Sequence, residues 1–413
     1  MKIEEFVKTI LGYEKIKVHD FRIETEEYHG ETIFVAKVKL YKKEQYRCPV
    51  CGEKCGKYGY QSNRYKRWRS LDISKFRFYV ECELPRCICP QHGVKTAKIP
   101  WAFPDSDYTY AFDMQVAYCA AMQPTNFVAR RYRIKWGTVG NCVKRVQTNV
   151  PSFQPNNFKN LRKIAIDEVK YKKGHKYITT VQNLETGEIV WAHDGFGDEV
   201  LKLFFELLNN EERSLITYVV ADGAQWITRQ VEKYCLNAVR CVDPFHVVSW
   251  GTEALDNVRK RLASDTKKKR FALLKNPENL TPNQQAQLEY FVKENPKLYR
   301  MYLCKERLRL IFRQDSYLLA VLALGRWLLW TRRCGVPEFE KLAEKITRNK
   351  KYILATLKYG LSTGKLEATN NIIGGIIRRS FGFSNVENLI ALIFIRTSEF
   401  LDVMDDQFFN YIG

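Results

Sequence analysis

Two short turns of matching shape constrain the fold of this chain more than any other feature of its sequence. Cys48-Pro-Val-Cys51-Gly is the first turn, and Cys89-Pro-Gln-His92-Gly is the second. Each turn offers two soft or borderline ligands, and four such ligands in tetrahedral geometry make a structural zinc site. The pattern therefore predicts a zinc ribbon with the ligands Cys48, Cys51, Cys89 and His92. Cys55 and Cys87 are near enough to replace one of them, and the alternative is a small sheet with reduced cysteines.

The region around these turns is predicted to consist of strands. Apolar residues alternate from Glu31 to Tyr41 and again from Phe76 to Leu84, which is the period of a half-buried strand. Between the turns, residues 54–69 interleave basic with aromatic side chains and carry no acid. This mixture suits phosphate contacts and base stacking, and a solvated basic segment is the alternative. The predicted DNA contacts here are Arg64, Arg67 and Arg69.

The charge of the chain favours a polyanionic partner. Its 413 residues include 67 Lys and Arg against 46 Asp and Glu, a formal net charge of +21, and nucleic acid is the partner that such a surplus favours. No stretch reaches the roughly 18 apolar residues of a membrane span. The first residues also lack the pattern of a secretory signal. We therefore expect a soluble cytoplasmic protein of two or three domains, with no membrane partner.

A helix-turn-helix is predicted between Pro124 and Arg145. Thr125 can cap a first helix, and a second helix is expected from about Trp136. The expected inward residues are Phe127, Val128 and Tyr132 on the first helix, and Val139 and Val143 on the second. The bases of this segment suit a helix placed in the major groove, although paired short helices occur in many helical domains. The predicted DNA contacts are Arg130, Arg131, Arg133, Lys135, Lys144 and Arg145.

After a candidate linker from Pro151 to Asn160, strands and helices alternate. Apolar runs predict strands at 161–169, 177–184, 188–193, 215–221 and 238–242, and helices at 198–208 and from about 224. Three antiparallel strands followed by helix, strand, helix and strand is the order of ribonuclease H-like domains. The first and fourth strands are neighbours in that fold. We therefore expect Asp167 in the first strand to lie beside Asp222 at the end of the fourth.

Two neighbouring carboxylates predict metal-dependent chemistry at phosphorus. Carboxylate oxygens are ligands that Mg²⁺ prefers. With a third acid, expected on a late helix, they can hold two ions about 4 Å apart for in-line displacement. Asp243 is an alternative ligand, and Glu168 is expected to point to the opposite face of the strand. His246 is either a hydrogen-bonding neighbour of the site or a packed structural histidine.

The chain resembles bacterial insertion-sequence transposases of the ISL-three family, which use a DDE site. The resemblance covers nearly the whole chain. It includes both metal-binding turns, the runs Arg67 to Asp72, His92-Gly93-Val94, Pro100-Trp101-Ala102, Ile166-Asp167-Glu168 and Asp243 to Val247, and the spacing Glu367…Asn370…Phe381-Gly382-Phe383. It implies Glu367 as the third catalytic acid. The long separation of Asp222 from Glu367 implies an all-helical insertion at about 251–360.

These patterns and the resemblance together imply an α+β multidomain chain. The expected parts are N-terminal strands and a zinc ribbon at 1–104, a helix-turn-helix at 105–150, and a ribonuclease H-like α/β catalytic domain at 158–413 that contains the insertion. The implied protein is a DNA transposase that binds terminal inverted repeats, cleaves DNA and transfers strands. It would use two catalytic Mg²⁺ ions and a structural Zn²⁺. Two ends held together imply a homodimer, acting at the bacterial nucleoid.

Further DNA contacts are expected in the basic run at 256–275 and at the end of the late helix. These residues are Lys267, Lys268, Lys269, Arg378 and Arg379. Such runs contact backbone phosphate or form solvated faces. One rival interpretation of the chain is a zinc-dependent DNA-binding regulator with an inactive ribonuclease H-like core. A second is a nuclease of RNA–DNA hybrids, which would need neither the ribbon nor the helix-turn-helix.

Overall fold

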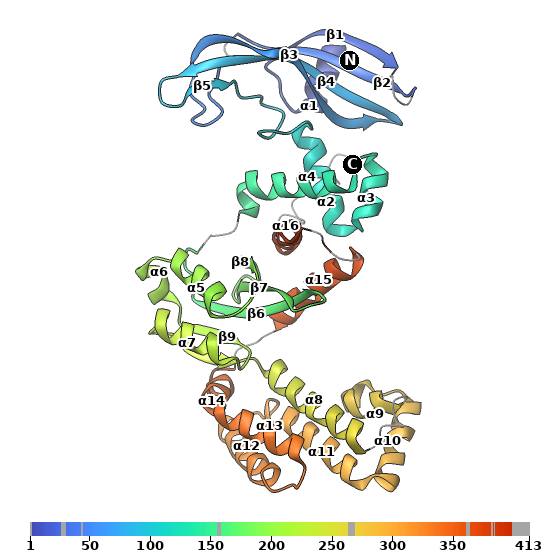
Figure 1. Cartoon of the computed structure of the whole chain (residues 1–413), viewed down its shortest axis with the longest axis vertical. Coiled ribbons are helices and arrows are strands. Elements are labelled where there is room, and N and C mark those ends of the chain that lie inside the picture. Colours follow the sequence, from blue (N-terminus) through green and yellow to red (C-terminus); the bar gives the residue numbers. More distant parts are fainter. Residues whose placement is uncertain are drawn as a thin grey trace. The chain divides into compact units, whose positions relative to one another are not determined.

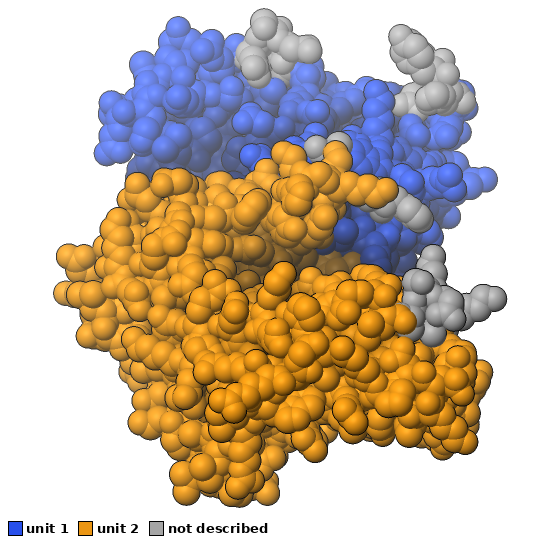
Figure 2. All heavy atoms as spheres, turned by 60° about the horizontal axis from the view of Figure 1, so that its bottom comes forward, with its two compact units in different colours: residues 1–154, 376–413 blue, residues 155–375 orange. Residues whose placement is uncertain are grey.

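The computed structural model describes residues 2–25, 30–42, 44–154, 158–262, 269–360, 364–380, 383 and 385–398. These residues belong to two compact units (Figure 2). The first unit comprises residues 1–154 and 376–413, and the second comprises residues 155–375. One boundary between the units falls within Pro151 to Asn160, the segment predicted as a linker. The other falls within helix α15 (Gly364–Arg379).

The first unit contains a five-stranded sheet with the order β1-β2-β4-β3, in which β5 pairs with β4 (Figure 1). The strands are β1 (Ile16–Thr25), β2 (Thr32–Leu40), β3 (Gly56–Ile73), β4 (Phe76–Cys89) and β5 (Gly93–Thr96), and helix α1 (Ile3–Leu11) precedes them. The two strands predicted in this region are confirmed as β2 and β4. Most of the basic segment 54–69 forms β3. Its Trp68 packs edge-to-face on Trp101 in the core below the sheet, with ring centroids 5.8 Å apart.

The described part of the first unit also contains the helices α2 (Tyr110–Met122), α3 (Thr125–Tyr132), α4 (Trp136–Asn149) and α16 (Val386–Thr397). The predicted pair of helices is confirmed, and the second begins at Trp136 as expected. Two details were wrong. Pro124, not Thr125, occupies the N-cap of α3, and no side chain caps that helix. Phe127 is 53% exposed, because the buried face of α3 is formed by Val128 and Tyr132, four residues apart.

A buried ion pair joins α2 to α4. The carboxylate of Asp113 is fully buried and accepts two hydrogen bonds from the Arg145 guanidinium, at 2.7 and 3.0 Å. The hydroxyl of Ser106 donates a third, at 2.9 Å. Asp113→Ala would leave the half-buried guanidinium without its partner. We expect the free energy of unfolding to fall by about 3–5 kcal/mol, measured by denaturant titration.

The matched control for this prediction lies on the same helix. Lys144 pairs with Glu387, but both side chains are largely exposed, so Lys144→Ala should change the stability little. Equal losses in the two variants would contradict the assignment of a stabilising role to the Asp113 pair.

The second unit contains a five-stranded sheet with the order β10-β9-β6-β7-β8. The strands are β6 (Lys163–Lys172), β7 (Lys176–Asn183), β8 (Ile189–Asp194), β9 (Tyr218–Ala221) and β10 (Val239–Val242), and the helices beside them are α5 (Asp198–Leu207), α6 (Asn210–Leu215) and α7 (Gln225–Tyr234). Strands β6, β7 and β8 are antiparallel, whereas β9 and β10 run parallel to β6. The predicted order of strands is confirmed. Helix α6 was missed, and it shortens the predicted strand at 215–221.

Helices fill the described part of the chain between β10 and α15, as predicted. They are α8 (Pro244–Leu262), α9 (Arg270–Leu274), α10 (Pro282–Glu294), α11 (Pro296–Ile311), α12 (Tyr317–Thr331), α13 (Pro337–Arg348) and α14 (Lys350–Tyr359). They share one apolar core, which includes Trp250 of α8 and Trp327 of α12. No helix among the described residues combines the length and apolar character needed to cross a membrane.

Candidate active site and metal centre

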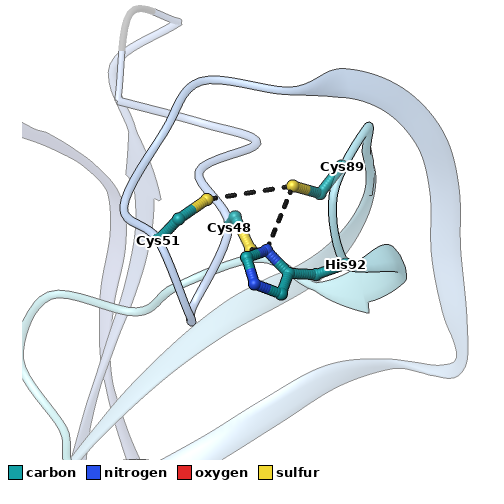
Figure 3. Close-up of side chains that lie close together, drawn as sticks. All are labelled: Cys48, Cys51, Cys89 and His92. Atoms are coloured by element: carbon teal, nitrogen blue, oxygen red, sulfur yellow. Dashed lines mark hydrogen bonds between the residues drawn. The ribbon is translucent and has the colours of Figure 1, made fainter.

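The four residues predicted as zinc ligands lie together in the first unit (Figure 3). The Cys51 and Cys89 sulfurs are 3.8 Å apart. Nδ1 of His92 lies 3.5 Å from the Cys89 sulfur and 3.7 Å from the Cys48 sulfur. All four ligand atoms lie within 4.8 Å of one another. Three sulfurs and one imidazole nitrogen at these distances fit a tetrahedral zinc site.

The local sequence of each turn explains why these ligands converge. Gly52 and Gly93 follow the ligand pairs with φ of 73° and 67°, a left-handed conformation that favours glycine. Burial raises the pKa of the Cys89 thiol, but hydrogen bonds from the backbone of Gln91 and His92 and from the neighbouring cysteines together outweigh burial and lower the pKa to about 7. The turn therefore favours the thiolate, which is the form that binds zinc.

The two alternative cysteines lie close to the cluster but outside the group of four ligand atoms. The Cys55 thiol lies 3.3 Å from the Glu53 carbonyl oxygen, and the Cys87 thiol lies 3.7 Å from the Arg47 carbonyl oxygen. Neither belongs to the group of four. The geometry therefore favours the ligand set chosen from the two matched turns.

The register of the second sheet places Asp167 and Asp222 next to each other. Strands β6 and β9 are parallel, and Ile166 pairs with Ala221. Asp167 and Asp222 follow these two residues directly, so both acids lie at the same end of adjacent strands. Asp167 is 8% exposed and Asp222 is half-buried. Neighbouring parallel strands are about 4.8 Å apart, which brings the two carboxylates into one polar region.

Helix α15 brings a third acid toward this region. Asn370 donates a hydrogen bond from Nδ2 to Oδ2 of Asp167. Glu367 lies three residues earlier in the first turn of α15, so it shares a helix face with Asn370, and its side chain is exposed. The side chain of Gln182 in β7 donates to the Thr369 hydroxyl, at 2.7 Å, and holds α15 on the sheet.

The three acids are more widely spaced than the zinc ligands. Among the described residues, the Cys48 group is the only one whose three or more ligand atoms all lie within 4.8 Å of one another. The donor set, three carboxylates approached from two strands and a helix, fits hard divalent cations such as Mg²⁺.

Other titratable groups surround Asp167. Nε2 of His246, near the start of α8, lies 3.6 Å from Oδ1 of Asp167 and 4.0 Å from Oδ2 of Asp243. Burial lowers the pKa of His246, but these carboxylates outweigh burial and raise it above its ordinary value. Burial and the charges of Asp222 and Asp167 raise the pKa of Glu168 to about 7. The negative charges of Asp167 and Asp222 therefore raise the pKa of both His246 and Glu168.

The sequence interpretation missed a buried arginine behind this site. Arg240 of β10 is 5% exposed and donates hydrogen bonds to the carbonyl oxygens of Ala221 and Asp222. Burial lowers its pKa to about 10. A charged residue within an apolar strand was the signal that could have identified it, because such a residue is costly unless paired. Arg240 fixes the backbone at the end of β9.

The predicted nucleic-acid contacts of the first unit differ in whether they form ion pairs. Those engaged in ion pairs are Arg67 with Glu24 and Glu81, Arg69 with Asp72, Arg133 with Asp72 and Glu31, Lys144 with Glu387, and Arg145 with Asp113. The other exposed residues are Arg130, Arg131, Lys135, Arg378 and Arg379. In the second unit, Lys269 lies over the Tyr290 ring. Lys267, Lys268 and the side chain of Arg64 are outside the described residues.

Comparisons with known proteins agree on one family. The model of the ISL-three family of DDE proteins, described as a transposase, matches residues 164–393. The transposase for insertion sequence element IS1557 of Mycobacterium tuberculosis is 37% identical to the chain, with 95% of each sequence covered. The transposase for insertion sequence element IS1001 of Bordetella parapertussis is 26% identical, with 89% of this chain and 92% of that protein covered.

Proposed function

The chain belongs to the ISL-three family of DDE transposases, and from this we propose that it cleaves DNA at terminal inverted repeats and joins the resulting 3′-hydroxyl to a target. The observation that carries the proposal is the register of β6 and β9, which puts Asp167 beside Asp222. The hydrogen bond from Asn370 to Asp167 ties helix α15, which bears Glu367, to the same strand end.

We further propose that the second unit is a ribonuclease H-like catalytic domain with a helical insertion. Its strand order, with β6 between antiparallel β7 and parallel β9, supports this assignment. Asp167, Asp222 and Glu367 would hold two Mg²⁺ ions, which stabilise charge at the attacking and leaving oxygens when bound. Asn370 and His246 orient the Asp167 carboxylate, and Arg240 fixes the Asp222 backbone. These contacts hold two of the three acids in place before DNA arrives.

The first unit would recognise the transposon ends. The Cys3His cluster would hold structural zinc, and α3 with α4 would form the helix-turn-helix. The exposed Arg130, Arg131 and Lys135 support this role, because exposed cations can contact phosphate. Two ends brought together require a homodimer. The protein would work in the cytoplasm, on the DNA of the nucleoid.

A cleavage assay with three substrates tests this function. The full chain is incubated in Mg²⁺ with a duplex ending in the inverted repeat that flanks the gene, with a scrambled duplex, and with an RNA–DNA hybrid. We expect cleavage at the repeat boundary that leaves a 3′-hydroxyl, and little cleavage of the other two substrates. Binding of the repeat without cleavage would favour the inactive regulator, and preferred cleavage of the hybrid would favour the nuclease.

A further inference from the structure

The helical insertion packs directly against the turn that carries Asp222. Gly223 follows that acid, and a Cβ atom added there would lie 2.5 Å from Cη2 of Trp250 and 3.1 Å from Oδ1 of Asn349. Trp250 belongs to α8, and Asn349 is the N-cap of α14. Glycine is therefore required at this position, because any side chain would clash with the indole. Trp250 and Asn349 thus form a surface of the insertion that packs against the end of β9, where Asp222 lies.

A lysine of α13 lies on this surface, next to Trp250. Nζ of Lys345 is 4.0 Å from the centroid of the Trp250 ring. Burial lowers the pKa of Lys345, and the charges of Glu253 and Asp222 oppose that shift, which places both carboxylates in its surroundings. Its ammonium group makes no hydrogen bond or ion pair with any residue in the described part of the chain, and the side chain is partly exposed. Lys345 thus presents a cation with no hydrogen-bonded or ion-paired partner among the described residues, near the turn that carries Asp222.

This position suits a phosphate group. The site must accept a polyanion close to the carboxylates of Asp167, Asp222 and Glu168, and the phosphates that flank the reacting one need cations besides the metal ions. A lysine ammonium is a compact charge with three donors that bind phosphate strongly. Contact with the face of the Trp250 ring already restricts the position of the Lys345 ammonium group. The Lys345 side chain therefore loses less conformational entropy when a phosphate binds.

We propose that Lys345 binds a backbone phosphate of the DNA adjacent to the scissile phosphate, and that the helical insertion thereby forms part of the substrate-binding site. The proposal rests on the proposed function, since it requires DNA at the three acids. Lys345 is a binding residue in this account. The competing interpretation is that its charge only offsets Asp222 and Glu253 within the folded protein.

The test combines protein variants with substrates that lack single phosphate charges. Wild type, Lys345→Gln and Lys345→Arg are compared on repeat-ended duplexes that carry one neutral methylphosphonate at successive positions around the cleavage site. Lys341→Gln, an exposed lysine one turn earlier on α13, is the matched control. Steady-state kinetics give KM and kcat for each pair, and melting temperatures verify that each variant is folded.

We expect Lys345→Gln to raise KM roughly tenfold, as for the loss of one charged hydrogen bond, and Lys345→Arg to restore most of it. One methylphosphonate position should cause the same loss in wild type and no further loss in Lys345→Gln. A plot of the logarithm of DNA affinity against the logarithm of salt concentration should be less steep for Lys345→Gln, by the amount expected for about one phosphate contact. Lys341→Gln should behave as wild type.

The proposal is overturned if the losses from Lys345→Gln and from the methylphosphonate add at every position, or if KM is unchanged. It is also overturned if no single methylphosphonate raises KM in wild type, a result that does not depend on the folding of any variant. Failure of the proposed function looks different, because wild type would then cleave none of the unmodified repeat-ended duplexes.

Discussion

Replacing Asp167 with asparagine should abolish cleavage of a repeat-ended duplex while leaving binding of that duplex intact. The substitution keeps the shape of the side chain but removes the negative charge that a divalent cation requires. Metal ions supply several kcal/mol of transition-state stabilisation at such sites, so we expect the cleavage rate to fall by roughly 10³-fold or more. Single-turnover cleavage in Mg²⁺ gives the rate, and an electrophoretic shift without metal gives the affinity.

The control for Asp167→Asn is Glu199→Gln, which removes an exposed carboxylate from α5 of the same unit. It should cleave at the wild-type rate. A cleavage rate for Asp167→Asn within tenfold of wild type would remove Asp167 from the metal site. A parallel loss in both variants would show that the effect comes from net charge rather than from this carboxylate.

Replacing Cys48 with serine should eliminate zinc from the protein and unfold the turns that the metal joins. Structural zinc contributes on the order of 10 kcal/mol in small zinc-binding peptides, and Cys48 is a fully buried member of the ligand group. We expect about one zinc per chain in wild type and close to none in Cys48→Ser, measured by atomic absorption after dialysis. The DNA-end affinity should fall with the zinc content.

Cys55→Ser is the matched control for the zinc prediction, because this thiol lies near the cluster but outside the group of four. It should retain zinc and the wild-type melting temperature. Loss of zinc from Cys55→Ser, with retention in Cys48→Ser, would reverse the ligand assignment. Retention in both would place the zinc at other ligands, and a wild type without zinc would leave the four residues as a cluster of reduced thiols with a histidine.

Local sequence determined the features that could be predicted well. Each turn needs only five consecutive residues, with a glycine that tolerates positive φ, so the spacing of the turns was enough to select four side chains that lie together in the fold. The placement of Asp167 beside Asp222 followed from the order of strands, because neighbouring parallel strands end together. The helix pair at α3 and α4 followed from its apolar spacing, although Phe127 was assigned to the wrong face.

Long-range contacts explain what the sequence did not reveal. Arg67 was assigned to DNA, yet its guanidinium meets Glu24, which is far away in the chain. Asn370 was noticed only as part of a spacing, and its bond to Asp167 depends on how α15 packs across the sheet. Lys345 carried no local signal, because its role depends on Trp250 and on the Asp222 turn. Partners of this kind appear only once the chain has folded.

Anomalous X-ray diffraction from crystals of the chain bound to a repeat-ended duplex, with Mn²⁺ in place of Mg²⁺, tests the central claim most directly. The account predicts two manganese peaks about 4 Å apart, with ligands supplied by Asp167, Asp222 and Glu367 and with the scissile phosphate between them. Manganese bound at other carboxylates would contradict the account. A complex in which the duplex is bound, Glu367 faces solvent and no metal lies at the two aspartates would also contradict it.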